Sequence, residues 1–557
     1  MSSDLLRNAA GVLIDDDAFE FAIAHETSHA IDHHEGKLGM SSLTTAGWIR
    51  EGLGDVFGVL RQAYERDPIT GLVAPDWYKG LQCTGSGCPC VDSTSPSFAV
   101  PNTILGVASP TPTHISEVCF ACSENHNGYL ISKLAQLMGD PDNSGTHHGV
   151  TVPFVLDVGW TYKDLTQLFI DTLVGAATGS LEDMRDGLFQ AAQDLTQTLG
   201  DADAIAILTM VRAAADAIGL WSVAAAVGAA VPADQDIALA SRGGFHYSFW
   251  AASAGFLCYH TQACAFGGEC TGGIVDLAVP ISTGPAAATI GDTIFTVFGG
   301  EDGSLRMASL GPNGFWAEGP HPSAATGAVG VELGTNVTPA LVEDDGELYL
   351  FYKEGSAANA PVRAMRLPFV DGVPGPQWEL LPTSPAVLAS TGLSVASAGL
   401  DIPETTTQAR IFVAFGTPDG TESDALVLWE FAAAAPSPNS LSYWETIGVD
   451  GETYVKPPIV GRPTVAYFRG LVQVAARVEA GGSLNAVVHA RCEPQPAGGC
   501  ENWHTAWPLE GSGEQRPAAL GLADANAPSD TARLGLWSLP ATGAAFAKPM
   551  LRSKASD

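Results

Sequence analysis

Apolar residues recur at helical spacing in the first part of the chain. This spacing predicts helices at 48–63, 127–138, 162–174, 180–199 and 202–220. The first of these helices has an inward face made of Ile49, Leu53, Val56 and Leu60. Ser180 is typical of a helix start, and Gly200 fits just beyond a helix end. We therefore expect a mainly helical domain, with bounds 1–235.

Past about Val231 the pattern changes to short β-type runs separated by turn residues. Examples of the runs are 293–298, 348–352, 410–415 and 471–475. Asp-Gly pairs, which favour tight hairpin turns, stand at Asp302-Gly303, Asp345-Gly346 and Asp419-Gly420. Between the helical and β-type parts lies a Cys-rich stretch. We interpret 236–275 as a connector and 276–557 as an all-β domain.

The β-type part contains a loose internal repeat. Trp316, Trp378, Trp444 and Trp503 end successive units, 62, 66 and 59 residues apart. Prolines stand near the starts of three units, at positions 339, 463 and 517. Several short strands per unit at this period favour a β-propeller, with about five blades in the available length. A set of β-sandwiches is the alternative, because the period is not strict.

Net charge narrows the range of partners. The chain of 557 residues has 61 acidic and 26 basic residues, and its formal charge is −35. Nucleic acid is not an expected partner, because phosphate contacts need lysine and arginine. The sequence shows no apolar run of transmembrane length and no signal-peptide pattern at Met1–Arg7.

Ten cysteines are clustered in the predicted loops and β-type segments, at positions 83, 88, 90, 119, 122, 258, 264, 270, 492 and 500. The even count and the loop setting predict disulfides and an extracellular, secreted protein. Cys88, Cys90, Cys119 and Cys122 form the alternative, a second and structural zinc site.

Two short motifs predict a metal site. His25 and His29 lie one turn apart if the segment after the apolar run 19–24 is helical, so both rings can reach one ion. Glu51 has the same spacing to Asp55 on the predicted helix 48–63. Glu51 can supply a third ligand, while Asp55 can accept a hydrogen bond from a ligating histidine. Glu26 sits beside the two rings, within reach of a zinc-bound water.

The first 225 or so residues resemble the catalytic region of the thermolysin family of zinc metallopeptidases. The matching text is 24–30, 51–58 and 125–134, followed by a helical tail. The resemblance implies a secreted zinc endopeptidase that acts on peptides or proteins. In it His25, His29 and Glu51 bind Zn²⁺, Glu26 is the general base, Asp55 supports a ligand and His126 stabilises the oxyanion. It also implies Ca²⁺, although one family calcium ligand falls on Gln62, which weighs against calcium.

The sequence departs from the family pattern at several points. Glu51 follows His29 by 22 residues, two more than in thermolysin. His126 stands two residues before Gly128, where the family histidine stands four before its glycine. The substrate-binding arginine, a tyrosine near the oxyanion and most of the β-rich front lobe have no counterpart. We therefore expect either a shortened precursor or a cleft that is open on one side.

Two competing hypotheses follow. A metzincin-like scheme would take Glu35 as the third ligand, but it needs glycine at position 32, where Asp32 stands. The other hypothesis makes the protein a catalytically impaired scaffold whose propeller binds glycans or cell-surface proteins. The complete metal motif favours the enzyme, whereas the missing family features favour the binding protein.

Overall fold

A computed structural model gives the fold. It describes residues 23–25, 27–30, 45–66, 102–104, 107–109, 112–118, 124–141, 145–156, 160–175, 180–228, 230–232, 235–252, 255–263, 271–275, 280–322, 338–355, 357–383, 387–399, 411–418, 424–431, 441–447, 454–480, 484–495, 499–508, 515–523, 532–541 and 546–555. The chain divides into two compact units, a helical one formed by 1–223 with 554–557 and a β unit formed by 224–553. Within the described residues, no helix is both long enough and apolar enough to cross a membrane.

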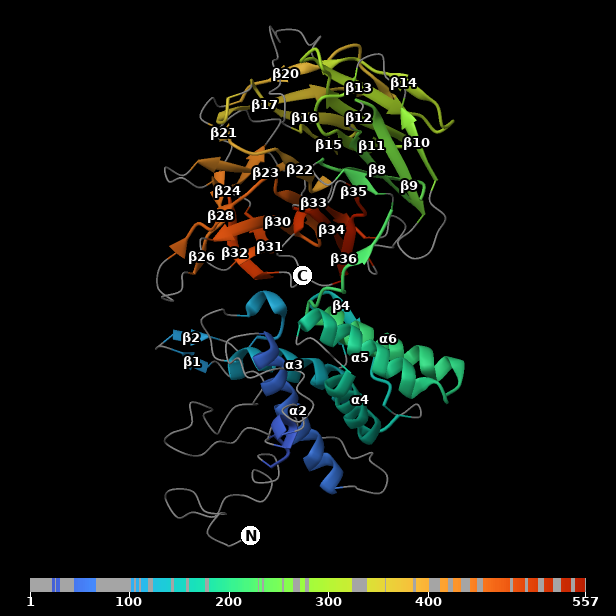
Figure 1. Cartoon of the computed structure of the whole chain (residues 1–557), viewed down its shortest axis with the longest axis vertical. Coiled ribbons are helices and arrows are strands. Elements are labelled where there is room, and N and C mark those ends of the chain that lie inside the picture. Colours follow the sequence, from blue (N-terminus) through green and yellow to red (C-terminus); the bar gives the residue numbers. More distant parts are fainter. Residues whose placement is uncertain are drawn as a thin grey trace. The chain divides into compact units, whose positions relative to one another are not determined.

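Helices build the first unit (Figure 1). They are α2 (Thr45–Arg66), α3 (Glu124–Gly139), α4 (Tyr162–Gly175), α5 (Leu181–Thr196) and α6 (Asp201–Ala217). A 3-10 turn, η2 (Ile115–Glu117), and two short hairpins accompany them: β1 (Asn102–Ile104) with β2 (Val107–Ser109), and β3 (Gly145–His147) with β4 (Val150–Val152). All five predicted helices are therefore confirmed, with ends shifted by a few residues.

Local sequence explains where these helices start and what they bury. Ser180 caps α5, because its side chain accepts a hydrogen bond from the backbone N–H of Asp183 at 2.9 Å. The predicted inward face of α2 is fully buried, with Ile49, Leu53, Val56 and Leu60 each at most 1% exposed. Burial of this apolar stripe, more than helix propensity, holds α2 in place.

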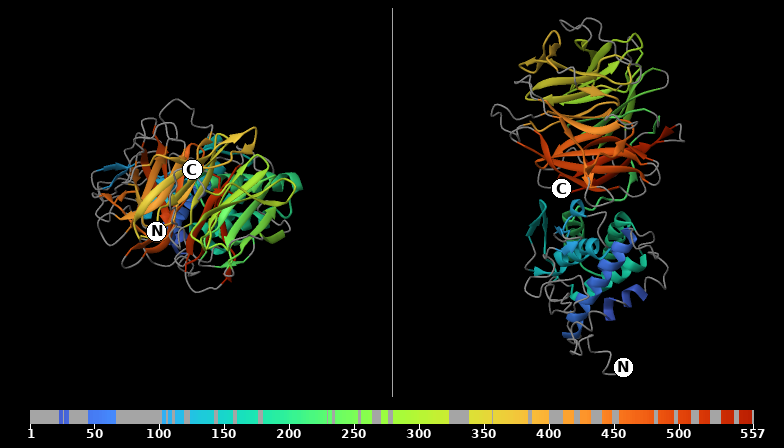
Figure 2. Two further views of the ribbon diagram at one scale, coloured as in Figure 1. Left: turned by 90° about the horizontal axis from the view of Figure 1, so that it is seen from above. Right: turned by 90° about the vertical axis from the view of Figure 1, so that its left-hand side faces the viewer.

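The described strands of the β unit form five main antiparallel sheets of four, four, five, nine and four strands. The nine-stranded sheet spans two blades, so the unit has six blades of four main strands each, here called blades 1 to 6. Figure 2 shows the β unit from two further directions. Blade 1 contains β7 (Ala238–Arg242), β8 (Phe245–Ala251), β9 (Leu257–Ala263) and β10 (Thr271–Val275). Blade 2 contains β11 (Ala286–Ile290), β12 (Thr293–Gly299), β13 (Leu305–Leu310) and β14 (Trp316–Glu318). Blade 3 contains β15 (Ala340–Asp344), β16 (Glu347–Lys353), β17 (Ala360–Leu367) and β20 (Glu379–Leu381), with β21 (Leu388–Ala389) also paired to β17.

The later blades follow the same plan. Blade 4 contains β22 (Ser394–Ser397), β23 (Ile411–Pro418), β24 (Asp424–Phe431) and β25 (Leu441–Tyr443). Blade 5 contains β29 (Thr464–Phe468), β30 (Leu471–Ala480), β31 (Leu484–Pro494) and β32 (Cys500–Pro508). Strand β28 (Pro458–Ile459) pairs with both β24 and β30 and so links these two blades. Blade 6 contains β33 (Gln515–Leu522), β34 (Leu534–Pro540), β36 (Met550–Lys554) and β5 (Ala225–Ala226).

Short pairs of strands complete the described part of the β unit. They are β18 (Phe369–Val370) with β19 (Val373–Pro374), β26 (Thr446–Ile447) with β27 (Tyr454–Val455), and β6 (Val231–Pro232) with β35 (Phe546–Ala547). The expected Asp-Gly turn between β15 and β16 is present, because Asp345 and Gly346 both have positive φ, 53° and 76°. The pair Asp419-Gly420 lies outside the described residues.

The blades close into a ring, as in a β-propeller. Their first strands, β7, β11, β15, β22, β29 and β33, each contact the next, and β33 contacts β7. The ring is closed by chain segments from both ends of the unit, since β5, which precedes blade 1, pairs with β36 as the outer strand of blade 6. Closure of this kind ties the two ends of the unit together within one sheet.

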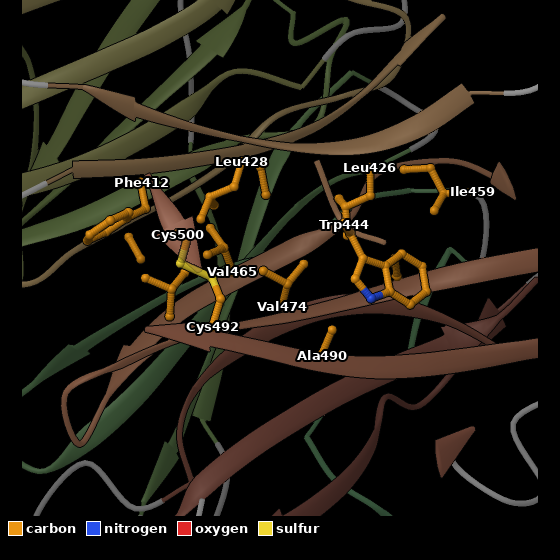
Figure 3. Packing of buried hydrophobic residues seen from close by; sticks show 14 of the residues in the cluster. Phe412, Leu426, Leu428, Trp444, Ile459, Val465, Val474, Ala490, Cys492 and Cys500 are labelled. Atoms are coloured by element: carbon orange, nitrogen blue, oxygen red, sulfur yellow. A yellow bond between two sulfur atoms is a disulfide. The ribbon is translucent and has the colours of Figure 1, made fainter. Parts of the chain in front are cut away.

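Hydrophobic clusters fill the spaces between neighbouring blades. Figure 3 shows the cluster between blades 4 and 5, where Phe412, Leu428 and Trp444 face Val465 and Val474. A disulfide joins Cys492 to Cys500 beside this cluster and links β31 to β32. Similar clusters lie between blades 2 and 3 and between blades 3 and 4. The β unit thus has a series of interfaces between sheets in place of one central core.

The expected number of about five blades is wrong. Three tryptophans, at positions 316, 444 and 503, lie in or directly after the outer strands of blades 2, 4 and 5, and Trp378 directly precedes that of blade 3. Blades 1 and 6 have no tryptophan at this place, so the repeat did not reveal them. Blade 1 occupies 238–275, where we expected a connector, and the boundary between units falls at 223/224.

Candidate metal centre and axial cluster

Three predicted metal ligands come together in the helical unit. Nε2 of His25 lies 3.0 Å from Nε2 of His29, while Oε2 of Glu51 lies 3.5 Å from the His25 nitrogen and Oε1 lies 3.5 Å from the His29 nitrogen. In a tetrahedral zinc site with bonds of about 2.0–2.1 Å, neighbouring ligand atoms are about 3.3–3.4 Å apart. The three side chains therefore already have nearly the spacing that one zinc ion needs, with a fourth position left over.

Two helical segments carry these ligands. Residues 23–25 and 27–30 are helical, so His25 and His29 lie one turn apart on the same face. Glu51 projects from the first half of α2. The side chains of His25, His29 and Glu51 are 17%, 22% and 13% exposed, so an ion can reach them from solvent. Among the described residues, this is the group of three with metal-ligand geometry.

Asp55 fixes the orientation of one ligand. Its Oδ1 lies 3.1 Å from Nδ1 of His25 and accepts a hydrogen bond from that ring nitrogen. Because Nδ1 is held in this hydrogen bond, Nε2 is the ring nitrogen that faces His29 and Glu51 and can bind a metal once it loses its proton. Asp55 lies one turn beyond Glu51 on α2 and is buried. This is the supporting role that the sequence predicts for it.

Glycines on α2 allow the close approach of the neighbouring helices. A Cβ at Gly54 would stand 2.8 Å from two atoms of the His25 ring, so only glycine fits there without a shift. On another face, a Cβ at Gly52 would stand 2.4 Å from the carbonyl oxygen of Gly128 on α3. In the segment 51–55, the carboxylates of Glu51 and Asp55 flank two glycines. Each glycine lets a different neighbouring helix approach α2 closely.

The two carboxylates dominate the electrostatics of the site. Burial lowers the pKa of His25, but hydrogen bonds and charges from Asp55 and Glu51 outweigh it and raise that pKa to about 10. Burial raises the pKa of Glu51, but His25, His29 and Arg50 lower it to below its ordinary value. A buried negative charge next to two imidazoles is the environment that a divalent cation neutralises best.

Several predicted residues fall outside the described part. Glu26 itself does so, and so do Asp32, Glu35 and the cysteines of the alternative zinc site. The backbone of His126 lies in the first turn of α3, but the position of its side chain is not described. Gln62 belongs to α2, again without a described side chain. The expected roles of Glu26, His126 and calcium therefore stay predictions.

The β unit has a second polar cluster, which sequence reasoning missed. Asp236, just before β7, accepts hydrogen bonds from Thr338 at 2.6 Å and from Arg516 at 3.1 Å. These residues precede or begin the first strands of blades 1, 3 and 6, so they meet where the first strands of the ring start. We call this group, together with Arg462, the axial cluster. The one sequence signal for the axial cluster was that its polar residues stand at the starts of predicted strands.

Comparisons with known proteins support no peptidase assignment. No protein-family model matches the chain, and no curated protein matches it. Solved structures that match include an α-L-arabinofuranosidase from Fusarium graminearum, with 12% identity, a TM-score of 0.41, and coverage of 60% of this chain and 98% of that one. An α-L-arabinanase from Penicillium chrysogenum, complexed with arabinobiose, has 13% identity, a TM-score of 0.40, and coverage of 60% and 98%.

A third match is the fucose-specific lectin from Aleuria aurantia, with 14% identity, a TM-score of 0.33, and coverage of 58% of this chain and 97% of that one. Each of these matches covers more of this chain than the helical unit contains. At these TM-scores the likeness identifies neither a ligand nor an activity for this chain.

These findings correct the expected membership of the thermolysin family and the expected zinc endopeptidase activity. The solved structures named above are glycosidases and a lectin, and neither family models nor curated relatives support a peptidase. The physical reason lies in what the motifs encode. Short motifs such as 25–29 and 51–55 specify metal-ligand chemistry, which recurs on unrelated folds, and they do not specify a substrate cleft. The departures from the family pattern at the arginine and the tyrosine were the relevant signals.

Proposed function

We propose that the helical unit binds one divalent transition-metal ion, with zinc as the ion that fits best. The observation that carries this proposal is the convergence of His25 Nε2, His29 Nε2 and the Glu51 carboxylate within zinc-ligand spacing. Two imidazoles and one carboxylate suit Zn²⁺, while calcium and magnesium prefer oxygen ligands only. Asp55 would hold His25 in the tautomer that binds. Bound zinc would tie the segment 23–30 to α2.

Metal analysis of the full chain tests this proposal. The wild-type protein, dialysed against Zn²⁺, should hold one zinc per chain more than Glu51→Gln, which keeps the shape of the side chain but loses its charge. Asp194→Asn, an exposed change on α5, is the matched control and should keep the wild-type content. Equal zinc in wild type and Glu51→Gln would remove the proposed site. Because the readout is a difference, zinc held by cysteines elsewhere does not confuse it.

A second function concerns the β unit, which we propose binds carbohydrate. The observation in its favour is the axial cluster, where a carboxylate, a hydroxyl and guanidinium groups from several blades meet. Such a group offers both acceptors and donors, as a polyhydroxylated ligand requires. The acidic excess of the whole chain disfavours nucleic acid as the alternative ligand.

Calorimetry on the full chain tests carbohydrate binding. Fucose and arabinobiose, the sugars named with the matched structures, are the first ligands, followed by a glycan array. Saturable binding that Asp236→Asn weakens would support the proposal, and a blank result with both sugars and the array would remove it. We also propose an extracellular location, which the disulfide between Cys492 and Cys500 supports.

A further inference from the structure

We propose that the axial cluster holds a binding site for an oxyanion, a carboxylate or a sulfate, which Arg462 and Arg516 recognise. The ligand is either an acidic sugar or a free inorganic anion. For the acidic sugar this inference rests on the proposed carbohydrate binding, whereas the oxyanion site itself does not. The argument begins with Arg462, which lies two residues before β29 in blade 5.

The guanidinium of Arg462 is held in place, but one of its nitrogen atoms has no hydrogen-bond acceptor. Its Nε donates a hydrogen bond to the carbonyl oxygen of Leu393, at 2.7 Å, which fixes the plane of the guanidinium. Its Nη1 is buried and has no hydrogen-bond partner among the residues that the structure describes. Oδ2 of Asp236 is 3.9 Å away, beyond hydrogen-bond length. A positioned, buried donor without an acceptor is what a site for an anion offers.

Asp236 is already engaged by other groups. Its Oδ1 accepts from Nη1 of Arg516, and its Oδ2 accepts from Thr338. Arg516 also donates through Nη2 to the carbonyl oxygen of Gln235, at 2.6 Å. Asp236 therefore does not meet the needs of Arg462 as well. The cluster has two guanidinium groups and one carboxylate, so its formal charge is positive in a chain that is strongly acidic overall.

Burial and the neighbouring charges set the pKa values of the cluster. Burial is the main cause that lowers the pKa of Arg462, the charge of Asp236 raises that pKa, and the charge of Arg516 opposes Asp236. Burial would raise the pKa of Asp236, but Arg462 and Arg516 together with its hydrogen bonds lower it below the ordinary value. Asp236 therefore stays ionised, and a bound anion would offset the cost of burying the charge of Arg462. A bound anion would relieve the repulsion between the two arginines.

Two glycines let the chain pack close to these side chains. A Cβ at Gly284, just before β11, would stand 2.5 Å from Oγ1 of Thr338, so only glycine fits there without a shift. Gly392, close before β22, packs beside Arg462, where a Cβ would lie 3.4 Å from three of its carbons, an ordinary contact. All six blades thus contribute to the cluster at the starts of their first strands. The side chains of Arg462, Arg516 and Asp236 are 12%, 19% and 20% exposed, so the cluster borders solvent although Nη1 of Arg462 itself is buried.

A purely structural role is the competing explanation. The pair Arg516 and Asp236 joins blade 6 to blade 1 and so helps to close the ring. That role accounts for the 3.1 Å contact between them. It does not account for the missing hydrogen bond of Arg462 Nη1, whose contact with Asp236 is an ion pair at 3.9 Å and not a hydrogen bond. Two guanidinium groups near one another are the arrangement that recognises carboxylate and sulfate oxygens in pairs.

Calorimetry with the full chain at constant ionic strength tests the site. Sodium glucuronate, sodium sulfate and neutral glucose are the three ligands. We expect saturable binding of at least one of the two anions, one per chain, and no binding of glucose at that site. Arg462→Gln should weaken the anion about ten-fold or more, because it removes the charge and the fork of donors. Arg306→Gln, an arginine paired with Asp302 in blade 2, is the control and should leave affinity unchanged.

The outcomes are distinguishable. Sulfate binding without glucuronate would support the site and assign it to free inorganic anions, whereas glucuronate binding would assign it to acidic sugars. No saturable binding of either anion, or equal affinity in a folded Arg462→Gln, would overturn the inference. If Arg462→Gln does not fold, Arg462→Lys decides, since a lysine keeps the charge but should lose about three-fold or more in affinity. A blank with fucose, arabinobiose and the glycan array removes carbohydrate binding but does not affect the sulfate test.

Discussion

The backbone of Gly54 lies directly against the imidazole of His25, where a Cβ would stand 2.8 Å from both Cε1 and Nδ1 of the ring. This contact explains why a glycine occupies the middle of α2, where it otherwise costs about 1 kcal/mol relative to alanine. The cost is offset by letting the segment that carries His25 and His29 approach Glu51. The proposed metal site therefore depends on a residue that ligates nothing.

Replacing this glycine should damage the metal site while the helices survive. In Gly54→Ala the new methyl group must push the His25 ring away from Glu51, so zinc affinity should fall about ten-fold or more. Helix α2 itself should keep its helicity, because alanine favours helix. Zinc titration by calorimetry and far-UV circular dichroism measure the two effects. Gly175→Ala, where a Cβ meets nothing within 4 Å, is the matched control. Unchanged zinc affinity in Gly54→Ala would show that His25 is not a ligand.

Asp55 should matter for zinc without touching it. In Asp55→Asn the amide no longer provides a charged acceptor for Nδ1 of His25, so the ring loses both its orientation and its raised basicity. We expect zinc affinity to fall about 10–100-fold, the usual effect of losing such a partner. Competition with a chromophoric chelator measures it. An Asp55→Asn protein with wild-type affinity would place Asp55 outside the metal site.

Proton release should accompany zinc binding. The pKa of His25 in the metal-free protein is raised to about 10, so the ring is protonated at neutral pH and must lose its proton to bind zinc. Protonation of His25 stabilises the metal-free fold below about pH 6.5, and this contribution is lost as pH rises toward 10. Apparent zinc affinity should therefore rise with pH up to about 10. Calorimetry in buffers of different ionisation enthalpy should show about one proton released, and no release would contradict the His25 environment described here.

The helical unit and the metal ligands were predictable because their signals are local. A stripe such as Ile49, Leu53 and Val56 predicts a buried helix face, and the i, i+4 spacing of His25 and His29 places two rings on one side of a helix. The approach of Gly54 to His25 could not be predicted, since it depends on how two helices pack. A single glycine in a helical pattern indicates only that another group packs close to the helix backbone, and does not identify that group.

The β unit was predictable as a repeat but not as a closed ring. The tryptophan spacing follows the outer strands of blades 2 to 5, so it revealed those four sheets. Blade 1 was missed because it has no tryptophan at this place. Blade 6 was missed also because it combines β5, near position 225, with strands more than 280 residues later. No local pattern reports such a pairing. The meeting of Asp236, Arg462 and Arg516 depends on the same closure and was hidden for the same reason.

Ring closure through β5 gives a stability prediction. The backbone N–H of Val227, directly after β5, donates to the carbonyl oxygen of Pro549 at 2.9 Å. Val227→Pro removes this donor at the seam, so the free energy of unfolding of the β unit should fall by about 1–3 kcal/mol. Urea unfolding followed by tryptophan fluorescence measures it. Val227→Ala controls for the lost side chain, and equal stability of the two variants would mean that the seam does not hold the ring closed.

The position of a bound zinc ion tests the central claim most directly. Crystals of the full chain grown with Zn²⁺ should show anomalous scattering at one point about 2.0–2.2 Å from His25 Nε2, His29 Nε2 and a Glu51 oxygen. Asp55 should remain hydrogen-bonded to Nδ1 of His25. Zinc located only at cysteines, or no anomalous peak between these three side chains, would contradict the account.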